Sequence, residues 1–130
     1  MDLLLDTHAF LRAAADPSKL SRNARAAIGN PANNVFVSAA VAWEITIKRD
    51  LGKIVLPLNP AMYVPTRLSM LGFKPLPITQ EHALAVNGLP KLHKDPFDRI
   101  MIAQAQVEGC TFVTDDAASL HYPVHILKAT

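Results

Sequence analysis

The apolar positions along the chain follow two kinds of pattern that alternate with each other. Short apolar runs predict buried strands at 3–5, 35–37 and 111–113, and a last strand is predicted at 124–127. Longer stretches with helical spacing predict helices at 8–14, 22–28, 39–51, 61–71, 80–87 and 96–108. Strands that alternate with helices are typical of an α/β fold, in which helices cover both faces of a mostly parallel central sheet.

Polar caps and glycines mark the ends of the predicted helices. The capping residues are Asp6, Ser21, Ser38, Thr79 and Asp95, and the terminating glycines are Gly29, Gly52, Gly72 and Gly109. The segment 73–78 contains Pro75 and Pro77, so it can form only a short edge strand. Because the chain shows no repeat, low-complexity segment or linker, we expect residues 1–130 to form a single domain.

Composition limits the class of protein. The single cysteine, Cys110, cannot form an internal disulfide and suits a reducing compartment, where we expect it to be buried. The first residues lack the basic region of a signal peptide, and no apolar run is long enough to cross a membrane. We therefore expect a cytoplasmic protein that does not enter a membrane. A net charge of only +2 excludes a histone-like wrapper of nucleic acid.

The segment 93–99, His-Lys-Asp-Pro-Phe-Asp-Arg, places charge at the start of an apolar helix. Asp95 can cap a helix that begins at Pro96 and runs to Gly109. Because this helix is apolar on most sides, it should lie inside the protein, with Asp98 in its first turn near the interior. Asp98 could simply complement the helix dipole, or it could take part in chemistry. The choice depends on whether other acids meet it.

Separate segments bring acids toward one edge of the predicted sheet. These acids are Asp6 after the first strand, Asp115 and Asp116 after the strand 111–113, and Glu44 and Asp98 on two of the helices. The carboxyl ends of parallel strands meet at one edge, where open α/β sheets bind their ligands. Each acid also has a structural alternative: Asp6 could be only a helix cap, and Glu44 could pair with Lys48 on a solvated face.

Clustered carboxylates repel one another unless a cation lies among them, so without one at least one carboxyl pKa should be raised. Oxygen ligands favour Mg²⁺ or Mn²⁺ over zinc, and a single cysteine cannot make a thiolate site. Two such cations held by three or four carboxylates serve phosphodiester hydrolysis, where water is the nucleophile. The acids therefore favour a metal-dependent phosphodiesterase.

The same segments resemble the PIN-domain nucleases, and among them the VapC-type toxins of bacterial toxin–antitoxin pairs. The matching stretches are 4–8, Ser38, 43–45, 47–48, 51–53, 93–99, 102–105 and 113–116, in family order and across nearly the whole chain. The resemblance implies a three-layer α/β/α PIN-like fold, a homodimer, ribonuclease activity on an RNA substrate, and a cognate antitoxin as partner.

The resemblance also implies residue roles. The active site would hold Mg²⁺ or Mn²⁺ through Asp6, Glu44, Asp98 and Asp116, with Thr114 in support. Asp95 lies close enough to Asp98 to share its role, and the family pattern Thr-x-Asp favours Asp116 over Asp115. As a hypothesis, RNA phosphates would be bound by Lys48, Arg99 and Arg12, whereas Trp43 and Phe97 are expected in the core.

Two alternatives stay open. A phosphoryl-transfer enzyme of the HAD or receiver type also places acids at the ends of parallel strands. The HAD type needs a second aspartate two residues after the first, where this chain has His8, and the receiver type needs a lysine for which Lys128 is a poor candidate. The second alternative is a non-catalytic module that binds RNA or a partner on the same fold, which would not need all the acids.

Overall fold

The structure, a computed structural model that describes residues 1–92 and 95–130, is built on a sheet of five strands in the order β3-β2-β1-β4-β5. The strands are β1 (Asp2–Leu5), β2 (Asn34–Ser38), β3 (Lys74–Leu76), β4 (Thr111–Thr114) and β5 (Ile126–Lys128). Each neighbouring pair is parallel, and β3, which contains Pro75, lies at an edge as predicted for a segment with Pro75 and Pro77. The predicted parallel α/β sheet is confirmed.

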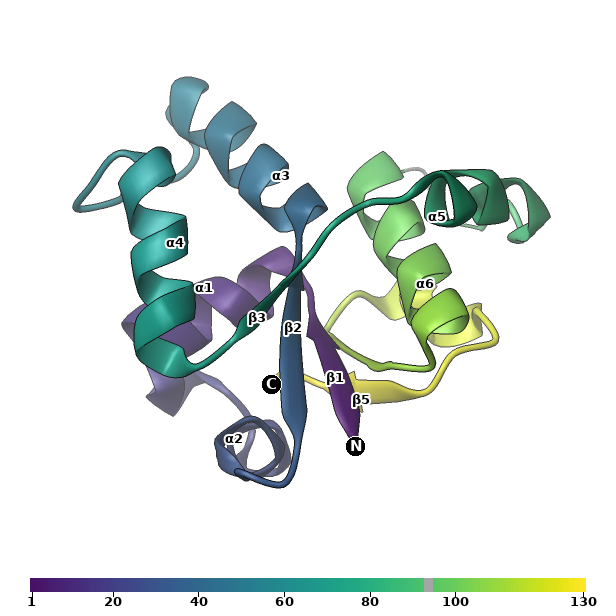
Figure 1. The fold of residues 1–130 in the computed structure, drawn as a ribbon, viewed down its shortest axis with the longest axis horizontal. Helices are drawn as coiled ribbons and strands as arrows, with labels where there is room; N and C mark the ends of the chain where they lie inside the picture. Colours follow the sequence, from purple (N-terminus) through teal and green to yellow (C-terminus); the bar gives the residue numbers. More distant parts are fainter. Residues whose placement is uncertain (93–94) are drawn as a thin grey trace.

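Helices flank this sheet on both sides (Figure 1). In that view α1 (Thr7–Ala15), α3 (Ala39–Asp50) and α4 (Pro60–Leu71) lie to the left of the strands, and α5 (Gln80–Ala85) and α6 (Pro96–Glu108) lie to the right. Helix α2 (Arg22–Gly29) packs near β5. Right-handed crossovers explain this division, because the chain crosses the sheet one way from β1 to β3 and the opposite way from β3 to β5. The three-layer arrangement is therefore confirmed.

Strand β1 lies at a topological switch point of the sheet. The chain leaves β1 toward β2 on one side, whereas β4 pairs with β1 on its other side. Such a reversal opens a crevice at the carboxyl ends of the two central strands, and ligands of open α/β sheets bind there. Asp6 directly follows β1, and Asp115 directly follows β4.

Local sequence sets the helix ends as predicted. The backbone N–H groups of the first turns donate to the side chains of Asp6, Ser21, Ser38, Thr79 and Asp95. Gly72 and Gly109 follow α4 and α6 with φ of 70°, a left-handed conformation that a residue with a Cβ adopts only under strain.

Two of the differences between the predicted and the observed element ends have local causes. The helix from Gln80 ends at Ala85 and continues as a tighter 3₁₀ turn, Val86–Gly88. The last strand begins at Ile126 instead of residue 124, because Pro123 and a tight turn, in which the Val124 N–H donates to the Tyr122 carbonyl over 2.8 Å, delay pairing.

The core lies where β1 and β4 meet α1 and α6. Leu3, Leu4, Leu5 and Phe112 are fully buried, and Cys110 is buried as predicted, with the pKa of its thiol raised by burial to about 11.

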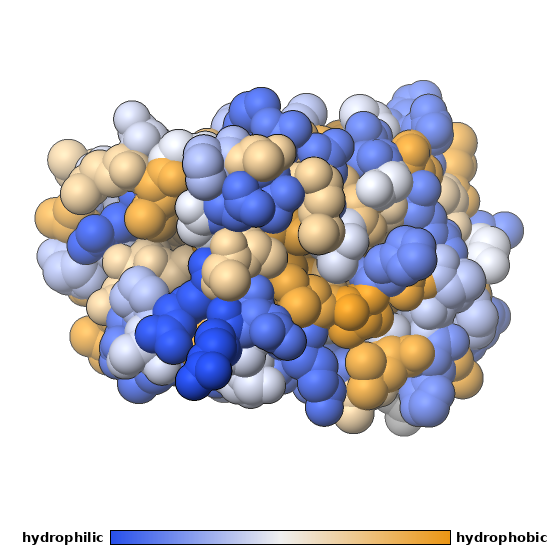
Figure 2. Space-filling view, turned by 90° about the horizontal axis from the view of Figure 1, so that it is seen from below, coloured by the Kyte–Doolittle hydropathy of each residue, from blue (hydrophilic) through white to orange (hydrophobic). Residues whose placement is uncertain are grey.

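The face in Figure 2 carries strongly hydrophilic residues beside hydrophobic ones. Within the part of the chain that the structure describes, no helix is long and apolar enough to cross a membrane.

Candidate active site

The predicted acids meet at the switch point of the sheet. They surround a cavity of about 340 Å³. Its lining consists of Asp6, Thr7, His8, Arg12, Glu44, Lys48, Asp95, Asp98, Asp115 and Asp116. The structure thus brings together the acids that the sequence places on separate strands and helices, and all of them reach one cavity.

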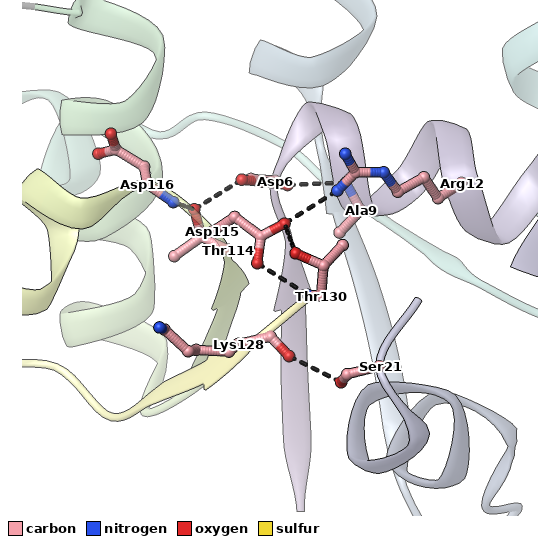
Figure 3. Close-up of polar contacts among 9 residues, drawn as sticks. All are labelled: Asp6, Ala9, Arg12, Ser21, Thr114, Asp115, Asp116, Lys128 and Thr130. Atoms are coloured by element: carbon pink, nitrogen blue, oxygen red, sulfur yellow. Dashed lines mark hydrogen bonds and ion pairs between the residues drawn. The ribbon is translucent and has the colours of Figure 1, made fainter. Parts of the chain in front are cut away.

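Asp6 is held on both sides by protein donors. Its Oδ1 accepts a hydrogen bond from the Ala9 N–H at 2.8 Å, and its Oδ2 accepts one from Thr114 Oγ1 at 2.6 Å (Figure 3). Burial raises the pKa of Asp6, and these two hydrogen bonds act against the rise. Asp6 is therefore a helix cap as well as a cavity acid, and Thr114 is hydrogen-bonded to it.

Glu44 projects from the middle of α3 and is only 5% exposed. Thr7 Oγ1 donates to its Oε1 at 2.6 Å, and Lys48 forms an ion pair with its Oε2 one turn along the helix. The hydrogen bond with Glu44 raises the pKa of the Lys48 ammonium. The i,i+4 pair considered from the sequence does form, but it lies at the cavity instead of on a solvated face.

Asp95 and Asp98 occupy the start of α6 with different surroundings. Asp95 is the N-cap, and its carboxylate accepts a hydrogen bond from the Phe97 N–H at 2.9 Å. Asp98 lies in the first turn, where burial and then the negative charges of Asp95, Asp6, Glu44 and Asp116 raise its pKa to about 8. The direction of this shift is the one expected for a carboxyl group in a crowded acidic site.

Asp115 and Asp116 turn in different directions at the end of β4 (Figure 3). The Asp116 N–H donates to Thr114 Oγ1 at 3.0 Å, and its carboxylate accepts hydrogen bonds from Ser119 at the start of η3 (Ala117–His121). Asp115 instead accepts hydrogen bonds from Arg12 and Thr130. Burial raises the pKa of Asp115, but these hydrogen bonds outweigh burial and hold it below its ordinary value.

The basic residues proposed to bind RNA have different positions. Arg12 and Lys48 line the cavity. Arg99 is directed to the protein: its guanidinium donates to the carbonyls of Pro90 at 2.8 Å and Val86 at 3.3 Å and to the Tyr122 hydroxyl at 3.2 Å. In this structure Arg99 therefore fastens α6 to the segment before it. His93 and Lys94 of the same motif lie outside the described residues.

His8 and Trp43 have positions that the sequence does not predict. His8 is exposed, lines the cavity and lowers the pKa of Asp6; its place two residues after Asp6 was the available signal. Trp43 was expected in the core, which is wrong, because it is 61% exposed. Its ring and the ring of partly buried Phe97 form a T-shaped pair with 5.1 Å between centroids.

The fold and the sequence match known proteins. The sequence model of the PIN domain family matches residues 3–123. The chain belongs to the PIN domain family. The curated protein Ribonuclease VapC16 of Mycobacterium tuberculosis (strain ATCC 25618 / H37Rv) is 39% identical over 75 residues, which are 58% of this chain and 51% of that protein. This match therefore spans about half the length of that relative.

Solved structures have the same fold as this PIN domain. VapBC2 from Rickettsia felis, bound to a DNA fragment from its promoter, superimposes with a TM-score of 0.74 over 100% of both chains at 17% identity. FitAcB from Neisseria gonorrhoeae superimposes with a TM-score of 0.64 at 19% identity, covering 97% of this chain and 96% of that one. A toxin–antitoxin complex from Klebsiella pneumoniae gives 0.62 at 18% identity, with the same coverage. These similarities confirm the PIN-like α/β/α fold.

Proposed function

We propose that this PIN domain is a VapC-type toxin, a metal-dependent endoribonuclease that hydrolyses RNA phosphodiester bonds and is neutralised by a cognate antitoxin. One observation carries the proposal: acids from two strand ends and two helices line one cavity at the switch point of the sheet. The name of the relative Ribonuclease VapC16 supports the choice of RNA as the substrate.

The donor chemistry of the cavity fits a hard divalent cation. Burial, and after it the negative charges of the neighbouring carboxylates, raise the pKa of Asp98 to about 8, so the acids of the cavity outweigh the positive charge of Arg12 and Lys48. Oxygen donors of this kind select Mg²⁺ or Mn²⁺. Within residues 1–92 and 95–130, no three His, Cys, Asp or Glu side chains stand ready to hold an ion as they are placed. Binding would therefore require their side chains to turn toward it.

We assign the metal-binding and catalytic roles to Asp6, Glu44, Asp98 and Asp116. When bound, the cation would activate water and stabilise the charge that develops on the phosphate. Thr114 and Thr7 fix the orientation of the Asp6 and Glu44 carboxylates through hydrogen bonds of 2.6 Å. Asp95 keeps a supporting role, because it caps α6 and adds negative charge beside Asp98.

The partners follow from the chemistry of the cavity and from relatives. Arg12 and Lys48 place positive charge beside the acids, where an RNA phosphate would need it. The structures of similar fold include a toxin–antitoxin complex, so we propose an antitoxin as the protein partner. The resemblance to the VapC-type toxins adds a homodimer as the proposed assembly. We also propose that residues 1–130 work as one domain, of which the family match covers 3–123.

Cleavage and metal binding measured on the same variants test this proposal. Wild type should cleave RNA with Mg²⁺ or Mn²⁺ and bind Mn²⁺ in a calorimetric titration, whereas Asp98→Asn should lose cleavage and bind Mn²⁺ more weakly. Asp50→Asn, which changes an exposed acid of α3 outside this cavity, should behave as wild type. RNA binding by wild type without any cleavage would favour the non-catalytic module instead.

A further inference from the structure

Arg12 is held at the cavity by a partner that is itself fixed. Its Nη1 donates to Asp115 Oδ2 over 2.9 Å, and about a third of each side chain is exposed. Asp115 also accepts hydrogen bonds from Thr130, at 2.8 Å from the N–H to Oδ1 and at 2.7 Å from Oγ1 to Oδ2 (Figure 3). Both carboxylate oxygens of Asp115 therefore accept hydrogen bonds from the protein.

The segment that carries Thr130 is anchored on two sides. The Ala129 N–H donates to the carbonyl of Thr114, the last residue of β4, over 3.3 Å, and Ala129 is fully buried. Ser21, at the start of α2, donates through its N–H to the Ala129 carbonyl at 2.7 Å and through Oγ to the Lys128 carbonyl at 3.0 Å. Arg12, Asp115 and Thr130 thus form a clasp, the Arg12 clasp, that is tied to the central sheet.

The hydrogen bonds of Arg12 leave donors for a ligand. Among the described residues, only its Nη1 has a hydrogen-bond partner, so the edge formed by Nε and Nη2 stays available. A guanidinium edge binds two oxygens of a phosphate in a planar fork. By contrast, both terminal nitrogens of Arg99 donate hydrogen bonds to protein acceptors, and Lys48 forms an ion pair with Glu44. Arg12 is therefore the arginine of this chain best placed to meet a phosphate beside the acids.

We propose that Arg12 binds non-bridging oxygens of the RNA phosphate at the acidic cavity, and that Asp115 is a positioning residue that holds Arg12 there. The inference rests on the proposed ribonuclease function. It assigns Asp115 a role distinct from that of its neighbour Asp116: its oxygens orient an arginine and do not serve as metal ligands. An arginine held in one place stabilises the charge of the transition state without reorganising at the moment of reaction.

A double-mutant cycle on an end-labelled single-stranded RNA tests this proposal. Arg12→Gln should lower kcat/KM by about tenfold or more, because a charge-assisted hydrogen bond to phosphate is lost. Asp115→Asn should lower kcat by up to about tenfold through misplacement of Arg12 without weakening RNA binding, since it also removes a negative charge from the cavity. In the double variant the Asp115 substitution should have no further effect. Arg12→Lys should restore part of the activity.

Two further readouts separate this role from a merely structural one. In an Asp6→Asn background, which the proposed function makes inactive, Arg12→Gln should make the salt dependence of RNA binding shallower by about 0.7 in log–log slope. Arg22→Gln, which changes an exposed arginine of α2 outside the cavity, should leave both slope and kcat unchanged. If Asp115→Asn does not fold, Thr130→Val removes one hydrogen bond of the Arg12 clasp and should show the same dependence on Arg12.

The outcomes distinguish the inference from the proposed function. Independent, multiplicative effects of the Arg12 and Asp115 substitutions would overturn the clasp, as would an Arg12→Gln variant as active as wild type. Loss of Mn²⁺ binding in Asp115→Asn would show instead that Asp115 is a metal ligand. If wild type itself cleaves no RNA with Mg²⁺ or Mn²⁺, the proposed function fails, whatever the variants do.

Discussion

Replacing Asp98 by asparagine is expected to stabilise the protein at neutral pH when no divalent metal is present. Burial and the neighbouring carboxylates raise the pKa of Asp98 from 3.8 to about 8, so the folded protein holds a proton that the unfolded chain releases. The free energy of unfolding therefore falls as pH rises from the unfolded pKa to the folded one. Asparagine has no carboxyl group to titrate, so the free energy of unfolding of Asp98→Asn should not fall with pH for this reason.

The magnitude follows from the width of that pH window. Between the ordinary pKa of 3.8 and pH 7, at about 1.4 kcal/mol for each pH unit, the loss reaches about 4 kcal/mol. Because the carboxylates share their repulsion and Asp98 stays partly solvated, we expect a measured gain of about 1–3 kcal/mol. At about 4 °C per kcal/mol, this raises the melting temperature by roughly 4–12 °C.

Melting curves of wild type and Asp98→Asn in EDTA, at pH 5, 7 and 8.5, measure the effect. The difference in melting temperature should be small at pH 5 and should grow up to pH 8.5, and Mn²⁺ should stabilise wild type more than the variant. Asp115→Asn is the matched control, because the lowered pKa of Asp115 stabilises the protein at neutral pH and its loss should have the opposite sign. A less stable Asp98→Asn at pH 7 would show that Asp98 serves α6 chiefly as a dipole partner.

Further predictions concern the remaining contacts. Arg99→Lys should lower stability by about 1–3 kcal/mol in urea denaturation, because lysine cannot reach the acceptors that the guanidinium joins, and should leave the salt dependence of RNA binding unchanged. Gly109→Ala should lower the free energy of unfolding by about 1 kcal/mol, because its φ of 70° strains a residue with a Cβ. Gly29→Ala, at a glycine without positive φ, should not lower it, and equal effects of the two substitutions would contradict this explanation. The antitoxin should place an arginine against Glu44 and Asp98, and a complex structure with the cavity open to solvent would contradict this.

The features that the sequence predicts best are set by neighbouring residues. Asp6 and Asp95 are helix caps because each precedes a helix whose first N–H groups need an acceptor, and that need is visible in the chain. The position of the acids also follows from pattern, because the alternation of strands and helices dictates a parallel sheet whose strand ends share an edge.

The features that the sequence does not predict depend on contacts between distant segments. The side chains of Asp115 and Asp116 are chemically identical, and the contacts that hold Asp115 come from Arg12 and Thr130, which lie far from it in the sequence or follow a strand. Arg99 follows Asp98 directly, yet its guanidinium meets carbonyls supplied by an earlier turn. Trp43 lies on α3 beside buried Glu44, but a helix turns about 100° per residue, so adjacent side chains face different surroundings.

The products of RNA cleavage by purified wild type and Asp6→Asn test the central assignment most directly. With Mg²⁺, wild type should leave 5′-phosphate and 3′-hydroxyl ends, formed when water attacks the phosphorus, the bond to the 3′ oxygen breaks and that oxygen takes up a proton. Its activity should vanish in EDTA. Asp6→Asn should keep its fold, since asparagine caps a helix as well as aspartate does, and should cleave no RNA. Cleavage by Asp6→Asn at the wild-type rate, or 2′,3′-cyclic phosphate ends formed in EDTA, would contradict a metal-dependent site built on these acids.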